Sequence, residues 1–233
     1  MTPLLERLRG GLIVSVQANE DSILNGPETI ALLARVGEAN GAVAVRIEGA
    51  QRIRAVRAAI ALPIVGLIKR RYEGFAPYIT STHEEAVAAA AAGADVVAFD
   101  ATERPRFSGA DPESLVAAIH ARGCLALADC AVRADGIRAT QAGADLLATT
   151  LAGYTPATQG RTLPDLALVA SLAERHPFVI CEGGITYPSQ VRAALRAGAA
   201  AVVVGTAITN IDVLVTRFAA HADPRTPSKP HTS

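Results

Sequence analysis

A repeated phrase, eight short apolar runs and a length of 233 residues together predict an α/β fold, a single (β/α)8 TIM barrel with a parallel eight-stranded core. In the repeated phrase a glycine stands where a helix would end and an apolar run follows it. The phrase occurs as NGAVAVRIE (40–48), AGADVVAFD (92–100), AGADLLATT (142–150) and AGAAAVVVG (197–205).

The apolar runs are continuous rather than alternating, which is typical of strands buried on both faces of a parallel sheet. Four of them belong to the repeated phrase, and LIVSVQA, PIVGLIK, LALADCA and FVICEGG fill the gaps between them. The eight predicted strands are 12–18, 42–48, 63–69, 95–101, 125–131, 145–151, 178–184 and 200–206.

Helical segments precede the glycines of the repeated phrase, as PETIALLARVGEA, THEEAVAAAAA, VRADGIRATQA and PSQVRAALRA. Several begin with helix-start signals: Pro27 before an acid, Thr82 before two acids, and Pro188 before a serine. An open, doubly wound sheet is the alternative arrangement. The count of eight strands and the lack of a GxGxxG motif after the first strand favour the closed barrel.

Composition narrows the class of protein. Lys plus Arg and Asp plus Glu both number 22, so the chain has no basic excess for nucleic acid, and no nucleic-acid partner is expected. No run reaches the ~18 to 20 apolar residues of a membrane helix, and the charged N-terminus does not resemble a secretory signal. Cys124, Cys130 and Cys181 lie in apolar runs without metal-like spacing, which predicts buried, reduced thiols and a cytoplasmic protein.

The chain is expected to form one domain over residues 1–221, followed by a tail at 222–233 that is rich in Pro, Ser and Thr. Such a composition predicts a disordered tail.

Polar residues end nearly every predicted strand, and the active sites of such barrels lie at the carboxyl ends of the strands. A polar group at so many strand ends, with both charge signs present, is hard to explain by packing, so these residues predict an active site. In chain order they are Gln17; Arg46 and Glu48; Lys69; Asp100; Asp129; Thr149 and Thr150; Glu182, Gly183 and Gly184; Gly205 and Thr206.

The glycines after the seventh and eighth strands predict a phosphate site. Many barrels hold a phosphate there with backbone N–H groups, and glycine permits the close approach. Gly183 and Gly184 pair by position with Gly205 and Thr206. Arg46 and Lys69 would supply further positive charge for an anion, so we expect a phosphorylated substrate.

These strand ends resemble the N-acetylmannosamine-6-phosphate 2-epimerase family. The resemblance spans about residues 11 to 218 and rests on the combination of KR-x-Y, TTL-x-GYT, EG-x-I and VVG-x-AIT, here GLIKRRY, ATTLAGYT, CEGGI and VVVGTAIT. It implies a TIM barrel, conversion of N-acetylmannosamine 6-phosphate to N-acetylglucosamine 6-phosphate in bacterial sialic acid breakdown, no metal or other cofactor, and a homodimer.

The resemblance also implies roles for single residues. Lys69 and Glu182 would be the catalytic pair, and Gln17, Arg46 and Asp129 would hold the sugar and its acetamido group. The phosphate would lie against Gly183, Gly184, Gly205 and Thr206. Tyr154 begins a long polar loop after the sixth strand, which would cover the ligand or be a plain loop.

The chemistry fits these residue types. Inversion at C2 requires an open aldehyde, so a carboxylate such as Glu182 suits proton transfer during ring opening. Lys69 suits the removal of the C2 proton if Arg46, Arg70 or burial lowers its pKa. One base on a rotating intermediate and two bases on opposite faces are both compatible with the sequence.

Two positions depart from the family pattern: Arg71 stands where the family usually has Asp, and Asn210 where it usually has Arg. Asn brings no charge to a phosphate. Another cation such as Arg71 or Arg161 substitutes, or phosphate binding is weaker, or the ligand differs.

Other interpretations of the same residues stay open. Lys69 could form a Schiff base in an aldolase or lyase, or the barrel could bind a sugar phosphate without catalysis. Arg46 could pair with Glu48 or Asp100. Asp100 could belong to the site or orient Lys69. Asp129, a buried acid that needs a partner, is expected to contact the substrate or Lys69, with a purely structural role as the alternative.

Overall fold

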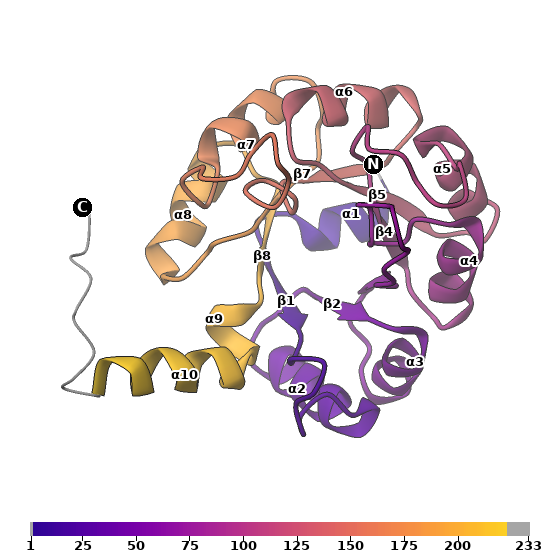
Figure 1. Ribbon diagram of the computed structural model, residues 1–233. Coiled ribbons are helices and arrows are strands. Elements are labelled where there is room, and N and C mark those ends of the chain that lie inside the picture. Colours follow the sequence, from indigo (N-terminus) through magenta and orange to yellow (C-terminus); the bar gives the residue numbers. More distant parts are fainter. Residues whose placement is uncertain (1, 223–233) are drawn as a thin grey trace.

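The computed structural model describes residues 2–222, and these form the closed barrel that the repeats predict. Eight parallel strands follow one another around the ring, and β8 pairs with β1 through partners such as Val203 and Ile13 (Figure 1). This closure excludes the open sheet. The strands are β1 (Leu12–Val16), β2 (Ala44–Glu48), β3 (Ile64–Leu67), β4 (Val96–Asp100), β5 (Leu125–Asp129), β6 (Leu146–Ala148), β7 (Val179–Glu182) and β8 (Ala201–Val204).

Each observed strand lies inside the range predicted for it and stops short of one or both ends. The missing residues at the carboxyl ends, such as those after Leu67 of β3 and Ala148 of β6, leave the sheet to form loops. The polar residues at these positions therefore have room to face a common space above the barrel.

Most of the helices surround the strand ring (Figure 1). Thr82 accepts a hydrogen bond from the backbone N–H of Glu85 in the predicted capping box, and Pro27 and Pro188 occupy the first helical positions. The helices are α1 (Pro3–Leu8), α2 (Pro27–Ala39), α3 (Ala50–Ala59), α4 (His83–Ala91), α5 (Pro112–His120), α6 (Arg133–Gln141), α7 (Leu166–Ala173), α8 (Pro188–Arg196), α9 (Thr206–Thr209) and α10 (Ile211–Ala222).

Helix α10 differs from the other long helices because no residue in it is buried, and it extends away from the ring (Figure 1). It ends at Ala222, the first residue of the tail predicted over 222–233, so that residue is helical, and residues 223–233 lie outside the described residues. Within residues 2–222, no helix has both the length and the apolar character needed to cross a membrane.

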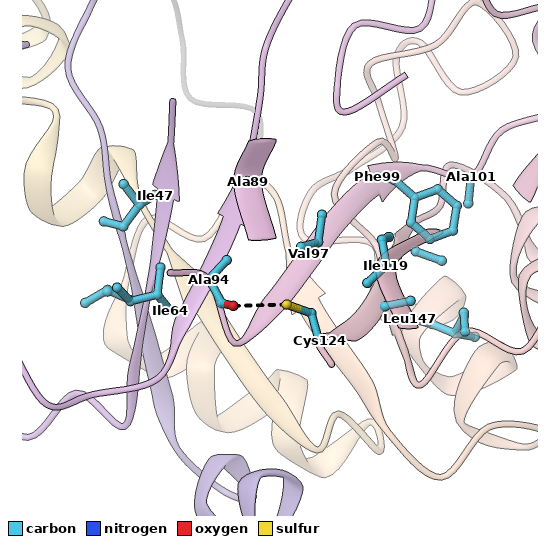
Figure 2. Close-up of a cluster of buried hydrophobic side chains, with 14 of the residues drawn as sticks. Ile47, Ile64, Ala89, Ala94, Val97, Phe99, Ala101, Ile119, Cys124 and Leu147 are labelled. Atoms are coloured by element: carbon cyan, nitrogen blue, oxygen red, sulfur yellow. Dashed lines mark hydrogen bonds between the residues drawn. The ribbon is translucent and has the colours of Figure 1, made fainter. Parts of the chain in front are cut away.

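The core has two layers, because successive strand residues point to opposite faces. One set, which includes Ile13, Val65 and Leu127, fills the barrel interior, and Leu8 of α1 packs against it. The other set joins the outer face of the strands to the helices (Figure 2). Cys124 lies in this outer layer with its Sγ 3.1 Å from the carbonyl oxygen of Ala94. All three cysteines are free and buried, as the sequence predicts.

Candidate active site

A cavity of about 340 Å³ opens at the carboxyl ends of the strands. This volume is at the small end of the range typical of ligand sites. Nine of the ten residues expected to catalyse the reaction or to bind or cover the substrate line it: Gln17, Arg46, Lys69, Tyr154, Glu182, Gly183, Gly184, Gly205 and Thr206. The tenth, Asp129, is fully buried and lies behind Arg46. The barrel thus brings together residues that lie up to 189 positions apart, since Gln17 Nε2 is 3.5 Å from the Thr206 hydroxyl.

Arg46 joins two carboxylates. Its Nη1 and Nη2 donate to Asp129 at 3.1 and 2.6 Å, and Nη1 also lies 3.0 Å from Glu182 Oε2. The hydroxyl oxygen of Thr150 is 2.5 Å from Asp129 Oδ1 and 3.2 Å from Glu182 Oε2. Arg46 is therefore not paired with Glu48 or Asp100. Because the Asp129 carboxylate accepts hydrogen bonds from Arg46 and Thr150, it holds the cavity wall in place rather than facing the cavity.

Burial and neighbouring charges shift the pKa values of Glu182 and Arg46. Burial raises the pKa of Glu182, and the Arg46 cation opposes this rise only in part. For Arg46 itself, burial lowers the pKa, but the carboxylates of Asp129 and Glu182 outweigh burial and hold it above the ordinary value. Glu182 can therefore carry a proton at a higher pH than an ordinary glutamate, beside an arginine that stays charged.

Lys69 enters the cavity from the end of β3. Its backbone N–H donates to Glu48 Oε1 at 3.3 Å. Burial and the Arg46 cation lower its pKa, while Glu48 and Glu182 act in the opposite direction. The Lys69 side chain remains exposed to water in the open cavity, so a ligand that displaces this water would strengthen the effect of burial.

The loop after β3 returns to Lys69 and brings Tyr78 into the cavity wall. Thr80 forms two hydrogen bonds with Ile68: its N–H donates to the Ile68 carbonyl at 2.8 Å, and its hydroxyl oxygen accepts from the Ile68 N–H at 3.1 Å. Thr80 holds a left-handed backbone with φ of 42°. Tyr78, two residues earlier, lines the cavity, and no local pattern in the sequence indicates this placement.

The predicted phosphate positions have the close packing that requires glycine. Gly184 has φ of 71°, and a Cβ there would overlap the side chain of Leu163 and lie 3.2 Å from its carbonyl carbon. A Cβ on Gly205 would lie 2.5 Å from Gln17 Nε2. Both positions therefore require glycine because of their packing, and both glycines line the cavity.

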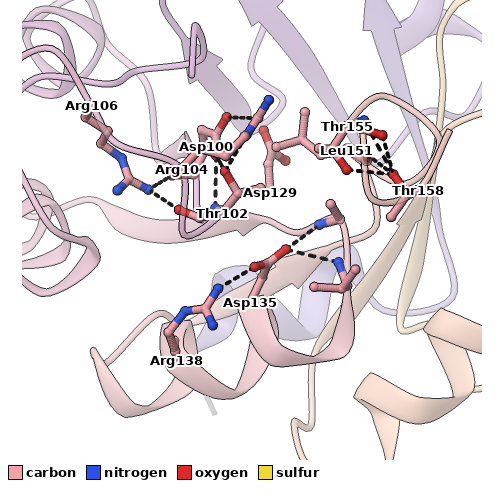
Figure 3. Close-up of polar contacts among 12 residues, drawn as sticks. Asp100, Thr102, Arg104, Arg106, Asp129, Asp135, Arg138, Leu151, Thr155 and Thr158 are labelled. Atoms are coloured by element: carbon pink, nitrogen blue, oxygen red, sulfur yellow. Dashed lines mark hydrogen bonds and ion pairs between the residues drawn. The ribbon is translucent and has the colours of Figure 1, made fainter. Parts of the chain in front are cut away.

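Asp100 lies elsewhere. Its carboxylate is 2.6 Å from the Thr102 hydroxyl and 2.7 Å from Arg104 Nη2 (Figure 3). Among residues 2–222 it forms no hydrogen bond with Lys69, and it does not line the cavity. Asp100 therefore stabilises the loop after β4 instead of orienting Lys69.

Asn210 lines the cavity without charge. Its side chain is buried, with Nδ2 3.2 Å from Asn19 Oδ1 and Oδ1 accepting from the backbone N–H of Val213. Neither cation suggested as its substitute lines this cavity: Arg71 lies over the Tyr78 ring at 4.8 Å, and Arg161 Nη1 is 2.9 Å from Asp165. Arg217 of α10 does line the cavity, and no motif or strand-end position in the sequence points to it.

The part of the chain that the structure describes contains no group of three or more His, Cys, Asp or Glu side chains placed to hold a metal ion. Independence from metal and other cofactors stays a prediction from the resemblance.

Comparison with known proteins points to one family. A family model described as "NanE: Putative N-acetylmannosamine-6-phosphate epimerase" matches residues 30–223. A protein of Synechococcus elongatus named "Putative N-acetylmannosamine-6-phosphate 2-epimerase" is 47% identical over 218 residues, which cover 92% of this chain and 94% of the relative. A protein of the same name from Escherichia coli O9:H4 (strain HS) is 46% identical over 204 residues, 87% of each chain.

The fold has a similar solved structure. It is titled as the N-acetylmannosamine-6-phosphate 2-epimerase from Clostridium perfringens, and it superposes with a TM-score of 0.90 at 37% sequence identity. The superposition covers 94% of this chain and 96% of the other.

Proposed function

The chain belongs to the N-acetylmannosamine-6-phosphate epimerase family, and from this premise we propose that it inverts C2 of N-acetylmannosamine 6-phosphate to give N-acetylglucosamine 6-phosphate without a cofactor. The observation that supports the reaction most directly is the position of Lys69 and Glu182. They line one cavity from β3 and β7, four strands apart in an eight-stranded ring, and so approach it from opposite sides.

Ring opening comes first in the proposed reaction, because C2 becomes acidic only beside the open aldehyde. Glu182 would transfer a proton between the anomeric hydroxyl and the ring oxygen. The raised pKa of Glu182 suits this task, since such a carboxyl holds its proton at a higher pH than an ordinary glutamate and can still release it.

Lys69 would then remove the C2 proton. The C2–H bond breaks, its electron pair forms the C1–C2 double bond, and the electron pair of the C1 carbonyl moves to the aldehyde oxygen, which becomes an enolate oxygen. The lowered pKa of Lys69 favours the neutral amine that this step requires. The Arg46 cation in the cavity wall would stabilise the enolate oxygen.

Glu182 would return a proton to the opposite face of C2 as the C1 carbonyl forms again. This assignment rests on the positions of β3 and β7 across the barrel mouth. Lys69 and Glu182 would then exchange protons with water to restore their starting states. A single base on a rotating intermediate is the alternative, and the exchange experiment in the Discussion separates the two.

The test is proton NMR of N-acetylmannosamine 6-phosphate in deuterium oxide with the wild-type protein. We expect the gluco epimer to accumulate with deuterium at C2. Trapping of a covalent adduct on Lys69 by borohydride would instead indicate a Schiff-base aldolase or lyase. Binding of the sugar phosphate without loss of the C2 proton would indicate a barrel that binds and does not catalyse.

The assembly and location are further parts of the proposal. A homodimer is supported by exposed apolar side chains along α10, where Ile211 is 45%, Val215 61% and Phe218 78% exposed. Light scattering should give a mass near twice the 24.0 kDa of one chain, and a mass of 24.0 kDa would contradict the dimer. A cytoplasmic location is supported by the three free, buried cysteines.

A further inference from the structure

The cations that line the cavity differ in what already neutralises them. Arg46 lies against the carboxylates of Asp129 and Glu182. Lys69 lies in the field of Glu48 and Glu182 and is assigned to the C2 proton. Arg217, the remaining cation in the cavity wall, makes no ion pair with any of residues 2–222.

The anchoring of the last two helices places Arg217 at the cavity. The Thr209 hydroxyl donates to the carbonyl of Ser15 at 2.8 Å, and Asn210 is bonded to Asn19, so the chain after β8 is tied to β1 and the loop that follows it. Arg217 follows Asn210 by seven residues, about two helical turns. Asn210 directly precedes α10, so Arg217 lies about two turns along this helix, and both side chains line the cavity.

Arg217 shares this cavity with the glycine backbone. Gly183, Gly184, Gly205 and Thr206 offer neutral N–H groups, while Glu182 beside them brings a carboxylate. A phosphate dianion in such a place needs a compensating cation, because a neighbouring carboxylate repels it. A planar guanidinium can supply both the charge and two parallel hydrogen bonds to a phosphate.

We propose that Arg217 binds the phosphate group of the substrate and supplies the charge that Asn210 does not. This inference rests on the proposed function, because it deepens the description of the same substrate. Helix α10, which has no buried residue, would then supply a substrate-binding side chain to the cavity wall.

The experiment compares wild type, Arg217→Ala, Arg217→Lys and Arg54→Ala. Arg54 is the matched control, since it is an exposed arginine on α3 that does not line the cavity. Three quantities are measured for each variant: the KM for N-acetylmannosamine 6-phosphate, the kcat/KM for unphosphorylated N-acetylmannosamine, and the Kd for N-acetylglucosamine 6-phosphate by titration calorimetry.

We expect Arg217→Ala to raise the KM and Kd for the phosphorylated sugars about tenfold, because it loses one charge-assisted contact in a partly wet site. The kcat/KM for the unphosphorylated sugar should not change. Arg217→Lys should recover part of the affinity, which a loss of helix packing alone would not explain, and Arg54→Ala should match wild type.

The outcomes separate this inference from the proposed function. If wild type epimerises and Arg217→Ala keeps its KM and Kd, the role of Arg217 is wrong and the function stands. If wild type does not epimerise yet binds N-acetylglucosamine 6-phosphate about ten times more tightly than Arg217→Ala, the function is wrong and the phosphate contact stands. Failure of wild type to bind the sugar phosphate overturns both.

Discussion

Arg46 forms a bidentate ion pair with Asp129, with Nη1 donating to Oδ1 at 3.1 Å and Nη2 donating to Oδ2 at 2.6 Å, and both side chains are buried. The pair joins the middle of β2 to the end of β5. Arg46 also lies 3.0 Å from Glu182. The buried carboxylate of Asp129 therefore fixes the position of the cation whose charge lowers the pKa of both Glu182 and Lys69.

Replacement of Asp129 by Asn should destabilise the protein by about 3 to 5 kcal/mol, because it leaves the buried Arg46 charge without its main partner. Activity should fall as well, since Arg46 loses its position. Urea denaturation and the NMR assay measure the two effects. Glu174→Gln is the control: Glu174 pairs with Arg133 at the surface, 3.7 Å away, and its loss should cost less than about 1 kcal/mol. Equal, small effects for both variants would contradict the structural role of Asp129.

Lys69 and Glu182 can be separated by isotope exchange. Both Lys69→Ala and Glu182→Gln should slow epimerisation by about 10²- to 10⁴-fold, the usual contribution of a general acid or base. In Glu182→Gln, catalysed ring opening is lost, but Lys69 should still exchange slowly the C2 proton of open-chain sugar that forms in solution, for the one epimer whose face it meets and without inversion. NMR in deuterium oxide, started from each epimer in turn, measures this. Equal exchange from both epimers would favour a single base.

Glu48 should tune the pH dependence through Lys69. The amine must be neutral to accept the C2 proton, so kcat/KM falls as the pH drops below the pKa of Lys69. The Glu48 carboxylate raises this pKa. Glu48→Gln removes that charge, so the pKa should fall further and the acid limb of the pH–rate profile should move to lower pH. A move to higher pH would contradict the assignment of Lys69 as base, and Glu113→Gln, a charge loss on α5, should leave the profile in place.

Gly184 should tolerate no side chain. Gly184→Ala forces a strained φ and drives the new Cβ into Leu163, and we expect a loss of about 2 to 4 kcal/mol together with a higher KM for the phosphorylated sugar. Gly160→Ala is the control for strain alone, because Gly160 has φ of 84° and open space around it. Thermal unfolding of both variants decides: similar shifts in Tm would mean that contact with Leu163 does not matter.

The strands and the ring of polar strand ends could be predicted because both depend on local sequence. A strand buried on both faces needs a continuous apolar run, and a parallel barrel places all its carboxyl ends on one side. Lys69 and Glu182 follow from this rule without knowledge of any contact. The predicted strands extend beyond the observed ones at their carboxyl ends, because apolar residues such as Ile68 continue past the last residue that pairs in the sheet.

Contacts between distant strand ends could not be predicted. The sequence allows Arg46 to pair with Glu48, two residues away, yet Glu48 pairs with Arg52 and Arg46 with Asp129, 83 positions away. Side chains two residues apart on a strand share a face, but the curvature of the closed barrel decides which groups across the mouth come within hydrogen-bond distance.

The sequence by itself determined the barrel, its eight strands and the position of the catalytic candidates at their ends, because hydrophobic burial and chain periodicity act locally. The tertiary structure alone decided that Asp129 lies behind Arg46, that Tyr78 returns to the wall beside Lys69, and that Arg217 reaches the cavity from α10. These placements depend on where a loop and a helix turn back over the barrel, which is set by contacts between segments far apart in the chain, such as Thr209 with Ser15.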